Sequence, residues 1–301
     1  MNRSTAFVYG SELRGNGNAS TTDVIVGITL FSVAFVAVIL GVVNLYFLKK
    51  VKMFHNPFGW FWASRTVGEM LTEMVHLLYN GPVTILQLQS INVWQGITPY
   101  LVLFIGSVSA CQMHTVIAVN RCIAIYSPLR YGQVFSKRVS YAVIAFSWIG
   151  CVFLAPWFFV FPCNLVGYDP QFYSYIFIKC YAGQERQFSY VGTAVNVFCF
   201  IICSSTVLVD ISTLSRIIYV QKSAFQNVVM LMSVSTFVYQ NYQNPPKGKI
   251  VDIVQILSIM TSHIANPLSL ILFNPEVRGR IGRSIGTTVV SSTHGQQVAS
   301  L

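Results

Sequence analysis

The chain has 301 residues, of which 54% are hydrophobic and only 9% are charged, and its formal net charge is +10. Soluble globular proteins have about 25% charged residues, so this chain has too little charge to coat a soluble domain of its length. The composition argues against a soluble protein and predicts a membrane protein.

Seven apolar segments follow one another along the chain, each close to the roughly 20 residues that a helix needs to cross a bilayer. They are residues 24–48, 57–79, 97–120, 139–161, 190–209, 223–240 and 252–273. The second contains charged residues and the sixth is short and partly polar, so six or fewer spans is the alternative. Because the segments show no period-two alternation, a β-barrel is disfavoured. We therefore expect an all-α membrane protein, a bundle of seven transmembrane helices.

The basic residues indicate how this bundle is oriented. With the N-terminus outside, the inner side holds twelve of them: Lys49, Lys50, Lys52, Arg121, Arg130, Lys137, Arg138, Arg216, Lys222, Arg278, Arg280 and Arg283. The outer side holds six: Arg3, Arg14, Lys179, Arg186, Lys247 and Lys249. The positive-inside rule predicts an extracellular N-terminus and a cytoplasmic C-terminus. The basic charge is thus a topology signal, with no nucleic-acid partner expected. The chain divides into an extracellular tail (1–23), a transmembrane domain (24–283) and a cytoplasmic tail (284–301).

The predicted outer segments contain sites for two covalent modifications. Two Asn-X-Ser sequons, at Asn2 and Asn18, are glycan acceptors if the tail is lumenal. No cleavable signal peptide is evident, so the first span would serve as the signal anchor. Five of the seven cysteines lie in or next to apolar segments, where a thiol packs as a small hydrophobe. Cys163 and Cys180 lie in the loop after the fourth span, where a disulfide is permitted; two unpaired loop cysteines are the alternative.

Several motifs resemble those of rhodopsin-like G-protein-coupled receptors. "NRC" at 120–122 stands where that superfamily has an acidic-Arg-aromatic triplet, and "NPLSL" at 266–270 stands for its Asn-Pro-X-X-Tyr element. Asn44, Trp148 and Pro156 also lie at matching places. More narrowly, "NPFGW" (56–60), "AVNRCIAIYSPLRYGQVFSKR" (118–138) and "ANPLSLILFNPEVR" (265–278) look like the nematode serpentine chemoreceptors of class X. The loop that begins "PCNLVGYDP" at 162 is similar as well.

The resemblance implies a chemosensory receptor in the plasma membrane of chemosensory neurons, which binds a small molecule and signals to a heterotrimeric G protein. It assigns coupling and activation to Asn120, Arg121, Cys122, Asn266 and Pro267. Because Asn120 replaces the acid that usually restrains the arginine, we expect a weaker inactive-state lock and some basal activity.

Other positions also depart from the superfamily pattern. Gly96 stands where many of its members have the cysteine that ties the third helix to the outer loop, so an internal Cys163–Cys180 bridge is the expected replacement. Leu270 replaces the tyrosine of the seventh-span motif. The third inner loop, "STLSRIIYVQKS", is short and has only two basic residues. These departures keep open the alternative of a receptor-like chain with impaired coupling.

The third span predicts a ligand site at its outer half. Counting back from Arg121 at helical spacing gives a stripe that should face the bundle interior, made of His114, Cys111 or Ala110, Ser107, Leu103 and Tyr100. Leu103, Ser107, Tyr100 and the adjacent Phe104 would line a pocket for an uncharged or weakly polar molecule. Simple helix packing by Leu103 and Phe104 is the alternative. His114 and His263 are expected to pack or to form hydrogen bonds, with no metal site.

The second span predicts a polar centre in the membrane. Arg65, Glu69 and Glu73 recur every four residues and share one helix face, and ionisable groups at this depth are costly, buried and paired. An Arg65–Glu69 pair that orders the bundle is one interpretation. The other is a sodium site formed by Glu69 with Asn44 and Asn266.

The sequence contains no phosphate loop, nucleophile elbow or carboxylate pair, so we expect neither an enzyme nor a cofactor. A transporter or channel is a further alternative, although the chain lacks the internal repeat that such folds often have.

Overall fold

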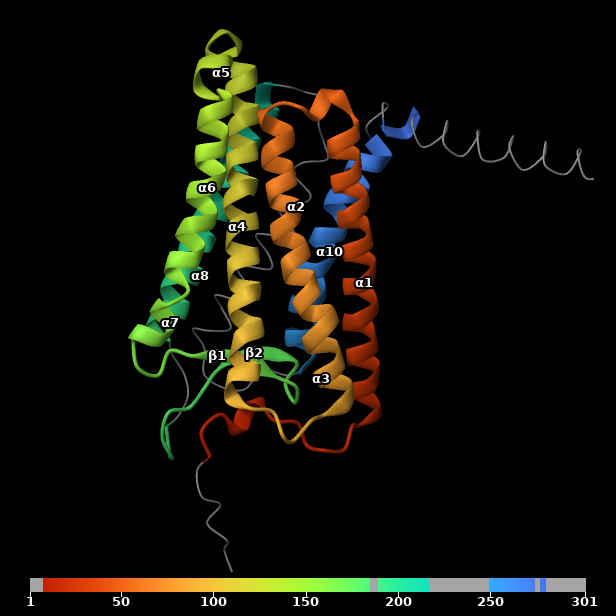
Figure 1. Cartoon of the computed structure of the whole chain (residues 1–301), viewed down its shortest axis with the longest axis vertical. Coiled ribbons are helices and arrows are strands. Elements are labelled where there is room, and N and C mark those ends of the chain that lie inside the picture. Colours follow the sequence, from red (N-terminus) through yellow and green to blue (C-terminus); the bar gives the residue numbers. More distant parts are fainter. Residues whose placement is uncertain (1–7, 185–188, 217–248, 274–276, 280–301) are drawn as a thin grey trace, which may run out of the picture.

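The computed structural model describes residues 8–184, 189–216, 249–273 and 277–279. These residues form an elongated bundle of long helices, with short elements at its two ends (Figure 1). The predicted sixth span, 223–240, lies outside the described residues, as do Asn2 and the predicted cytoplasmic tail.

The first two spans begin at side-chain caps. Helix α1 (Thr21–Lys50) starts with a capping box in which Ser20 and Asp23 each accept a hydrogen bond from the other's backbone amide. Helix α2 (Pro57–Val75) has Asn56 as its N-cap and Pro57 at its first position, where a proline costs no hydrogen bond. A π-helical turn, His76–Asn80, joins α2 to the short α3 (Gly81–Leu86). The second predicted span is therefore helical beyond its predicted end at 79.

Helix α4 (Val93–Tyr126) lies at the centre of the bundle and packs against α2, α6 and α8. The short helix α5 (Pro128–Val134) follows α4, at the same end of the bundle as the carboxyl terminus of α1. Helix α6 (Lys137–Leu154) and the single turn α7 (Trp157–Val160) come next. Helices α8 (Tyr190–Arg216) and α10 (Lys249–Phe273) are the other long helices among the described residues, and α10 packs beside α1.

Four of the described helical segments are long and apolar enough to cross a membrane: Thr21–Lys50, Val93–Tyr126, Lys137–Val160 and Tyr190–Thr213. Helix α2, which carries Arg65, Glu69 and Glu73, is not among them. Large apolar side chains are exposed on the outer faces of these four segments, which suits contact with lipid. Examples are Ile25, Phe35, Val42, Phe146, Phe153, Ile201 and Leu208. The protein is thus a mostly helical, multi-pass membrane protein.

A two-stranded antiparallel hairpin covers the opposite end of the bundle from α5 (Figure 1). Strand β1 (Val166–Asp169) pairs with β2 (Ser174–Phe177), with Val166 opposite Phe177. Asp169 Oδ1 accepts hydrogen bonds from the backbone amides of Gln171 and Phe172 and so closes the turn. The hairpin is an element that the sequence predicted only as a loop.

The N-terminal segment 9–17 straps this hairpin onto the bundle. Leu13 is fully buried between α4 and β1. A Cβ at Gly96 would come within 2.5 Å of Leu13 Cδ1, and one at Gly167 within 2.5 Å of Leu13 Cδ2. A larger residue at either position would therefore force the buried Leu13 side chain to move. Gly96, the residue that replaces the usual cysteine, allows this close approach.

Candidate functional site

A polar centre lies inside the bundle where α2, α4 and α10 face one another. Arg65 Nε donates to Glu69 Oε1 at 2.8 Å, and both side chains are at least 90% buried. Asn266 on α10 donates to the same carboxylate oxygen through Nδ2. An isolated buried charge is very costly, so Arg65 and Glu69 stabilise one another in the bundle interior.

Arg65 also joins α2 to α4. Its NH1 lies 2.7 Å from Nδ1 of His114. A guanidinium has only donors, so Nδ1 of His114 accepts this hydrogen bond and its ring proton belongs on Nε2. One arginine thus contacts a carboxylate on its own helix and an imidazole on its neighbour.

A second charged contact lies one turn away on α2. Glu73 Oε1 is 2.6 Å from Nδ1 of His263 on α10. Sequence reasoning had placed both residues in spans but had not paired them, because they are 190 positions apart. The i, i+4 spacing of Glu69 and Glu73 places both acids on one face of α2, but it does not indicate which residue of another helix either acid contacts.

Asn44 contacts Thr66 rather than Glu69 or Asn266. Its Nδ2 donates to Oγ1 of Thr66 at 2.8 Å, and Asn44 is fully buried. The structure therefore brings Arg65, Glu69 and Asn266 of the predicted set into direct contact. It joins Asn44 to α2 through the residue next to Arg65.

A small cavity opens beside this centre, between α1, α2 and α10. Its lining consists of Ala37, Gly41, Thr66, Glu69, Met70, Glu73, His263 and Pro267. It has room for about one water-sized group. Pro267, predicted to act in activation, lies in its wall.

Arg121 is at the end of α4 near α5, and an acid from another helix holds it. Its NH2 lies 3.1 Å from Oδ1 and 3.3 Å from Oδ2 of Asp210 on α8. The arginine side chain is 30% exposed and the aspartate 4%. Sequence reasoning missed Asp210, which directly follows the predicted span 190–209 and is the one acid in α8. Arg121 therefore has an acidic partner on α8, although the residue before it is Asn120 instead of an acid. Asn120 itself donates to the hydroxyl of Tyr131. Cys122 is partly buried and not in a disulfide.

The predicted ligand residues on α4 do not share one pocket: two pack against α7 and the hairpin, and one contacts α2. Tyr100 and Phe104 are buried in a cluster with Phe158, Val166 and Phe177, which come from α7 and the hairpin. Ser107 Oγ lies 3.0 Å from Oγ1 of Thr72 on α2, and Leu103 is partly exposed.

The hairpin itself fills the space above these residues. The ring of Tyr175 is 5.4 Å from that of Tyr100. Tyr168 and Tyr173 are fully buried, and their hydroxyls bond to Thr84 and Asp23. Burial raises the pKa of Tyr173 above the usual value of a phenol, and its hydrogen bond to Asp23 raises that pKa further.

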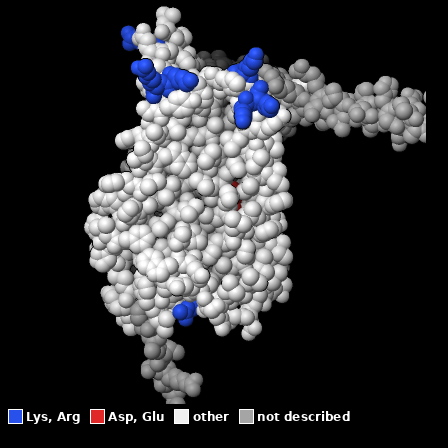
Figure 2. All heavy atoms as spheres, in the orientation of Figure 1, with Lys and Arg blue, Asp and Glu red and all other residues white. Residues whose placement is uncertain are grey.

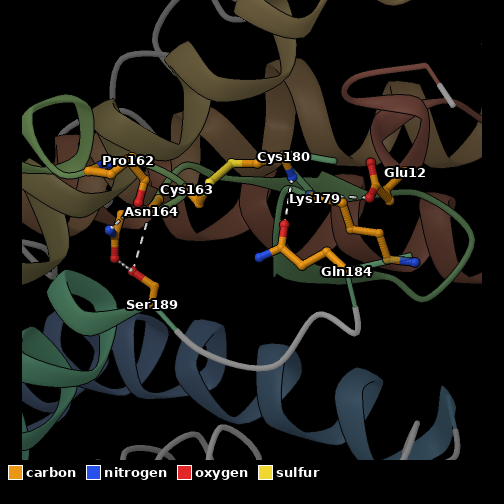
Figure 3. Close-up of a disulfide and its surroundings, with 8 residues drawn as sticks. All are labelled: Glu12, Pro162, Cys163, Asn164, Lys179, Cys180, Gln184 and Ser189. Carbon is orange, nitrogen blue, oxygen red and sulfur yellow. Dashed lines mark hydrogen bonds between the residues drawn. A yellow bond between two sulfur atoms is a disulfide. The ribbon is translucent and has the colours of Figure 1, made fainter. Parts of the chain in front are cut away.

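Cys163 and Cys180 form a disulfide at the base of the hairpin, with 5.6 Å between their Cα atoms (Figure 3). The prediction of this bridge is confirmed. Hydrogen bonds support both ends: the Lys179 amide donates to Glu12 of the N-terminal strap, and Asn164 Oδ1 accepts from Ser189. The bridge, the hairpin and the strap therefore form one connected cover. Asn18, a predicted glycan acceptor, is exposed beside it.

Comparison with known protein families gives one match. A family model described as "Serpentine type 7TM GPCR chemoreceptor Srx" matches residues 31–244, which is more than half of the chain. No curated protein matches the sequence closely enough to be counted as a relative.

Proposed function

The chain belongs to the Srx family of serpentine seven-transmembrane chemoreceptors, and from this premise we propose that it binds a small molecule and signals to a heterotrimeric G protein. The observation that carries the proposal is Arg121, which lies at one end of the central helix, partly exposed and held by Asp210 of a neighbouring helix. Such a contact between two helices can be made or broken as the bundle changes state.

We propose seven spans with the N-terminus outside and the cytoplasm at the α5 end. Support comes from the distribution of charge along the bundle, because Lys and Arg side chains gather at one end and are scarce at the other (Figure 2). The described basic residues near α5 include Lys49, Lys50, Lys52, Arg130, Lys137 and Arg138. Among the described side chains, the opposite end has Arg14 and Lys179. This asymmetry follows the positive-inside rule.

The G protein would contact the α5 end. Leu129 on α5 is 94% exposed. It stands next to Arg130 and two residues after Ser127, where α4 has ended. We propose that this leucine and Arg121 face the partner. A surface with one exposed leucine surrounded by basic residues fits a partner whose contact face has acidic residues around an apolar one.

The predicted ligand residues Tyr100, Leu103, Phe104 and Ser107 remain our proposal for the receptor pocket. Two of them are packed beneath the hairpin, so a ligand at this site would have to displace Tyr175 or Phe177. Binding would then be coupled to movement of the cover formed by the hairpin and the strap.

We favour the ion pair over sodium at the polar centre. Arg65 already gives Glu69 a cation at 2.8 Å, and Asn266 donates to the oxygen that would bind a metal. A sodium ion there would add a second positive charge beside the guanidinium. The residues present do not fit a sodium site of this kind.

Heterologous expression with a panel of small molecules and a G-protein dissociation readout tests the receptor function. We expect at least one molecule to release the G protein from the wild type, and Arg121→Ala to abolish that response. Lys52→Ala is the matched control, since it removes an exposed basic residue of the same end that lies between α1 and α2 rather than on α5, and it should keep the response. A ligand response that survives Arg121→Ala at full size would refute the coupling mechanism, whereas binding without any G-protein response would favour a receptor-like chain with impaired coupling.

Asp210→Asn is expected to raise basal signalling. The substitution keeps the shape of the side chain and removes the charge that holds Arg121. Because the arginine is partly exposed, the lost contact is worth about 1 kcal/mol, or roughly a fivefold change in the equilibrium between states. Basal G-protein dissociation at matched surface expression measures it, with Asp252→Asn at the other end of the bundle as control. Equal basal signals in the two variants would show that the Arg121–Asp210 contact does not restrain the receptor.

A further inference from the structure

The cavity between α1, α2 and α10 lies on the side wall of the bundle, away from the covered outer end. Ala37 and Gly41, which line the cavity, belong to the middle of α1, a 30-residue helix. Figure 2 shows acidic atoms within the otherwise uncharged wall, midway between the two ends. The acids that line the cavity are Glu69 and Glu73. A molecule dissolved in the bilayer would therefore meet a carboxylate at this depth.

Glu73 carries an acceptor with no partner. The residue is 1% exposed, and its Oε1 is taken by His263. Among the described residues, Oε2 has no hydrogen-bond partner although it is buried. A buried polar atom left without a hydrogen bond is unfavourable. A group that enters the cavity and donates to Oε2 would remove this cost.

We propose that this cavity is a lateral binding site for a lipophilic alcohol, whose hydroxyl donates to Glu73 Oε2 while its apolar chain lies against α1 and α2 in the bilayer. The proposal concerns binding alone and goes beyond the proposed receptor activity. It can therefore hold or fail whether or not the chain couples to a G protein.

Size and charge select this chemical class. The cavity has room for about one water-sized group, so the hydroxyl enters and the chain stays outside. Arg65 already pairs with Glu69, and His263 already occupies Oε1 of Glu73, so Oε2 of Glu73 is left to accept a hydrogen bond from a single donor, as a hydroxyl provides. A neutral alcohol also reaches the middle of the bilayer without the desolvation cost that a charged group meets. Met70, which lines the opening, offers a flexible apolar contact for the chain.

The test uses the purified full-length protein in phosphatidylcholine nanodiscs and an octanol that carries a photoreactive diazirine. After illumination, peptide mass spectrometry locates the labelled residues. We expect saturable labelling of the α1 and α2 segments around Gly41 and Met70. Unlabelled 1-octanol should compete about tenfold better than its methyl ether, which has the same chain but no hydrogen to donate. This comparison changes only the ligand, so it does not depend on how a variant folds.

Gly41→Ala tests the cavity from the protein side. A Cβ at Gly41 would lie 2.5 Å from Met70 Cγ, so the Met70 side chain, which lines the cavity, would have to shift and change the shape of the cavity. We expect saturable labelling to fall about tenfold. Gly150→Ala is the matched control, because a Cβ there meets nothing within 4 Å, and labelling should be unchanged. Equal competition by octanol and its ether, unchanged labelling in Gly41→Ala, or labelling spread evenly over the lipid-facing helices would each overturn the proposal.

Discussion

Arg65→Leu is expected to lower the free energy of unfolding by about 3–5 kcal/mol, because it leaves the carboxylate of Glu69 buried without its cation. Arg65 and Glu69 are both less than 10% exposed and lie 2.8 Å apart. The substitution also removes the donor that bonds His114 on α4. Thermal unfolding of purified protein in detergent, followed by tryptophan fluorescence, measures the loss.

The double variant Arg65→Leu with Glu69→Leu separates charge from packing. Replacing a buried ion pair by apolar residues of similar volume is often close to neutral, so the double variant should be more stable than Arg65→Leu alone. Arg130→Leu makes the same chemical change at an exposed position of α5 and should be nearly neutral. If Arg65→Leu were no less stable than Arg130→Leu, the pair would contribute nothing to the fold.

The spans that hydropathy predicts best are those whose outward faces are apolar and whose inward faces are mostly so. The segment 24–48 lies within α1, and 97–120 lies within α4, because residues such as Ile25 and Phe35 face outward and are as apolar as the residues that face inward. Both helices begin before the predicted spans because their N-caps, Ser20 and Asn92, lie ahead of the first residues of those spans. The number of spans stays a prediction, since residues 223–240 lie outside the described part.

The partners inside the bundle could not be predicted in the same way. Arg65 and Glu69 are on one helix, and their spacing alone predicted that they could pair. Asp210 meets Arg121 across 89 positions, and His263 meets Glu73 across 190. Such contacts depend on how helices rotate and pack, which the order of apolar residues does not determine. The same holds for Leu13, whose burial depends on two glycines in separate elements.

The disulfide was predictable for a simpler reason. Cys163 and Cys180 are the two cysteines in the predicted outer loop, so only one pairing was possible on the oxidising side of the membrane. The hairpin between them was not predicted. Its strands have four residues each, and their tyrosines are buried against helices rather than against another sheet. A short strand held by tertiary contacts gives little periodic signal.

Cys163→Ser is expected to destabilise the outer cover by about 3 kcal/mol, because the bridge closes a loop of about this length and restricts the unfolded chain. The two cysteines are 17 positions apart. The loss should extend to the N-terminal strap, since Glu12 bonds the Lys179 amide next to the bridge and Leu13 packs under β1. Hydrogen exchange should therefore become faster in residues 9–17 as well as in 164–179.

Reduction gives the matched comparison for this prediction. Dithiothreitol should lower the unfolding temperature of the wild type to that of Cys163→Ser and should leave the variant unchanged. Cys122→Ser, at a cysteine that is not in a disulfide, should behave like the wild type in both conditions. If exchange rose only in 164–179 while 9–17 stayed protected, the packing of Leu13 and the backbone hydrogen bonds of the strap to Gln87 and Leu88 would be enough to hold it. The cover would then consist of two independent parts rather than one.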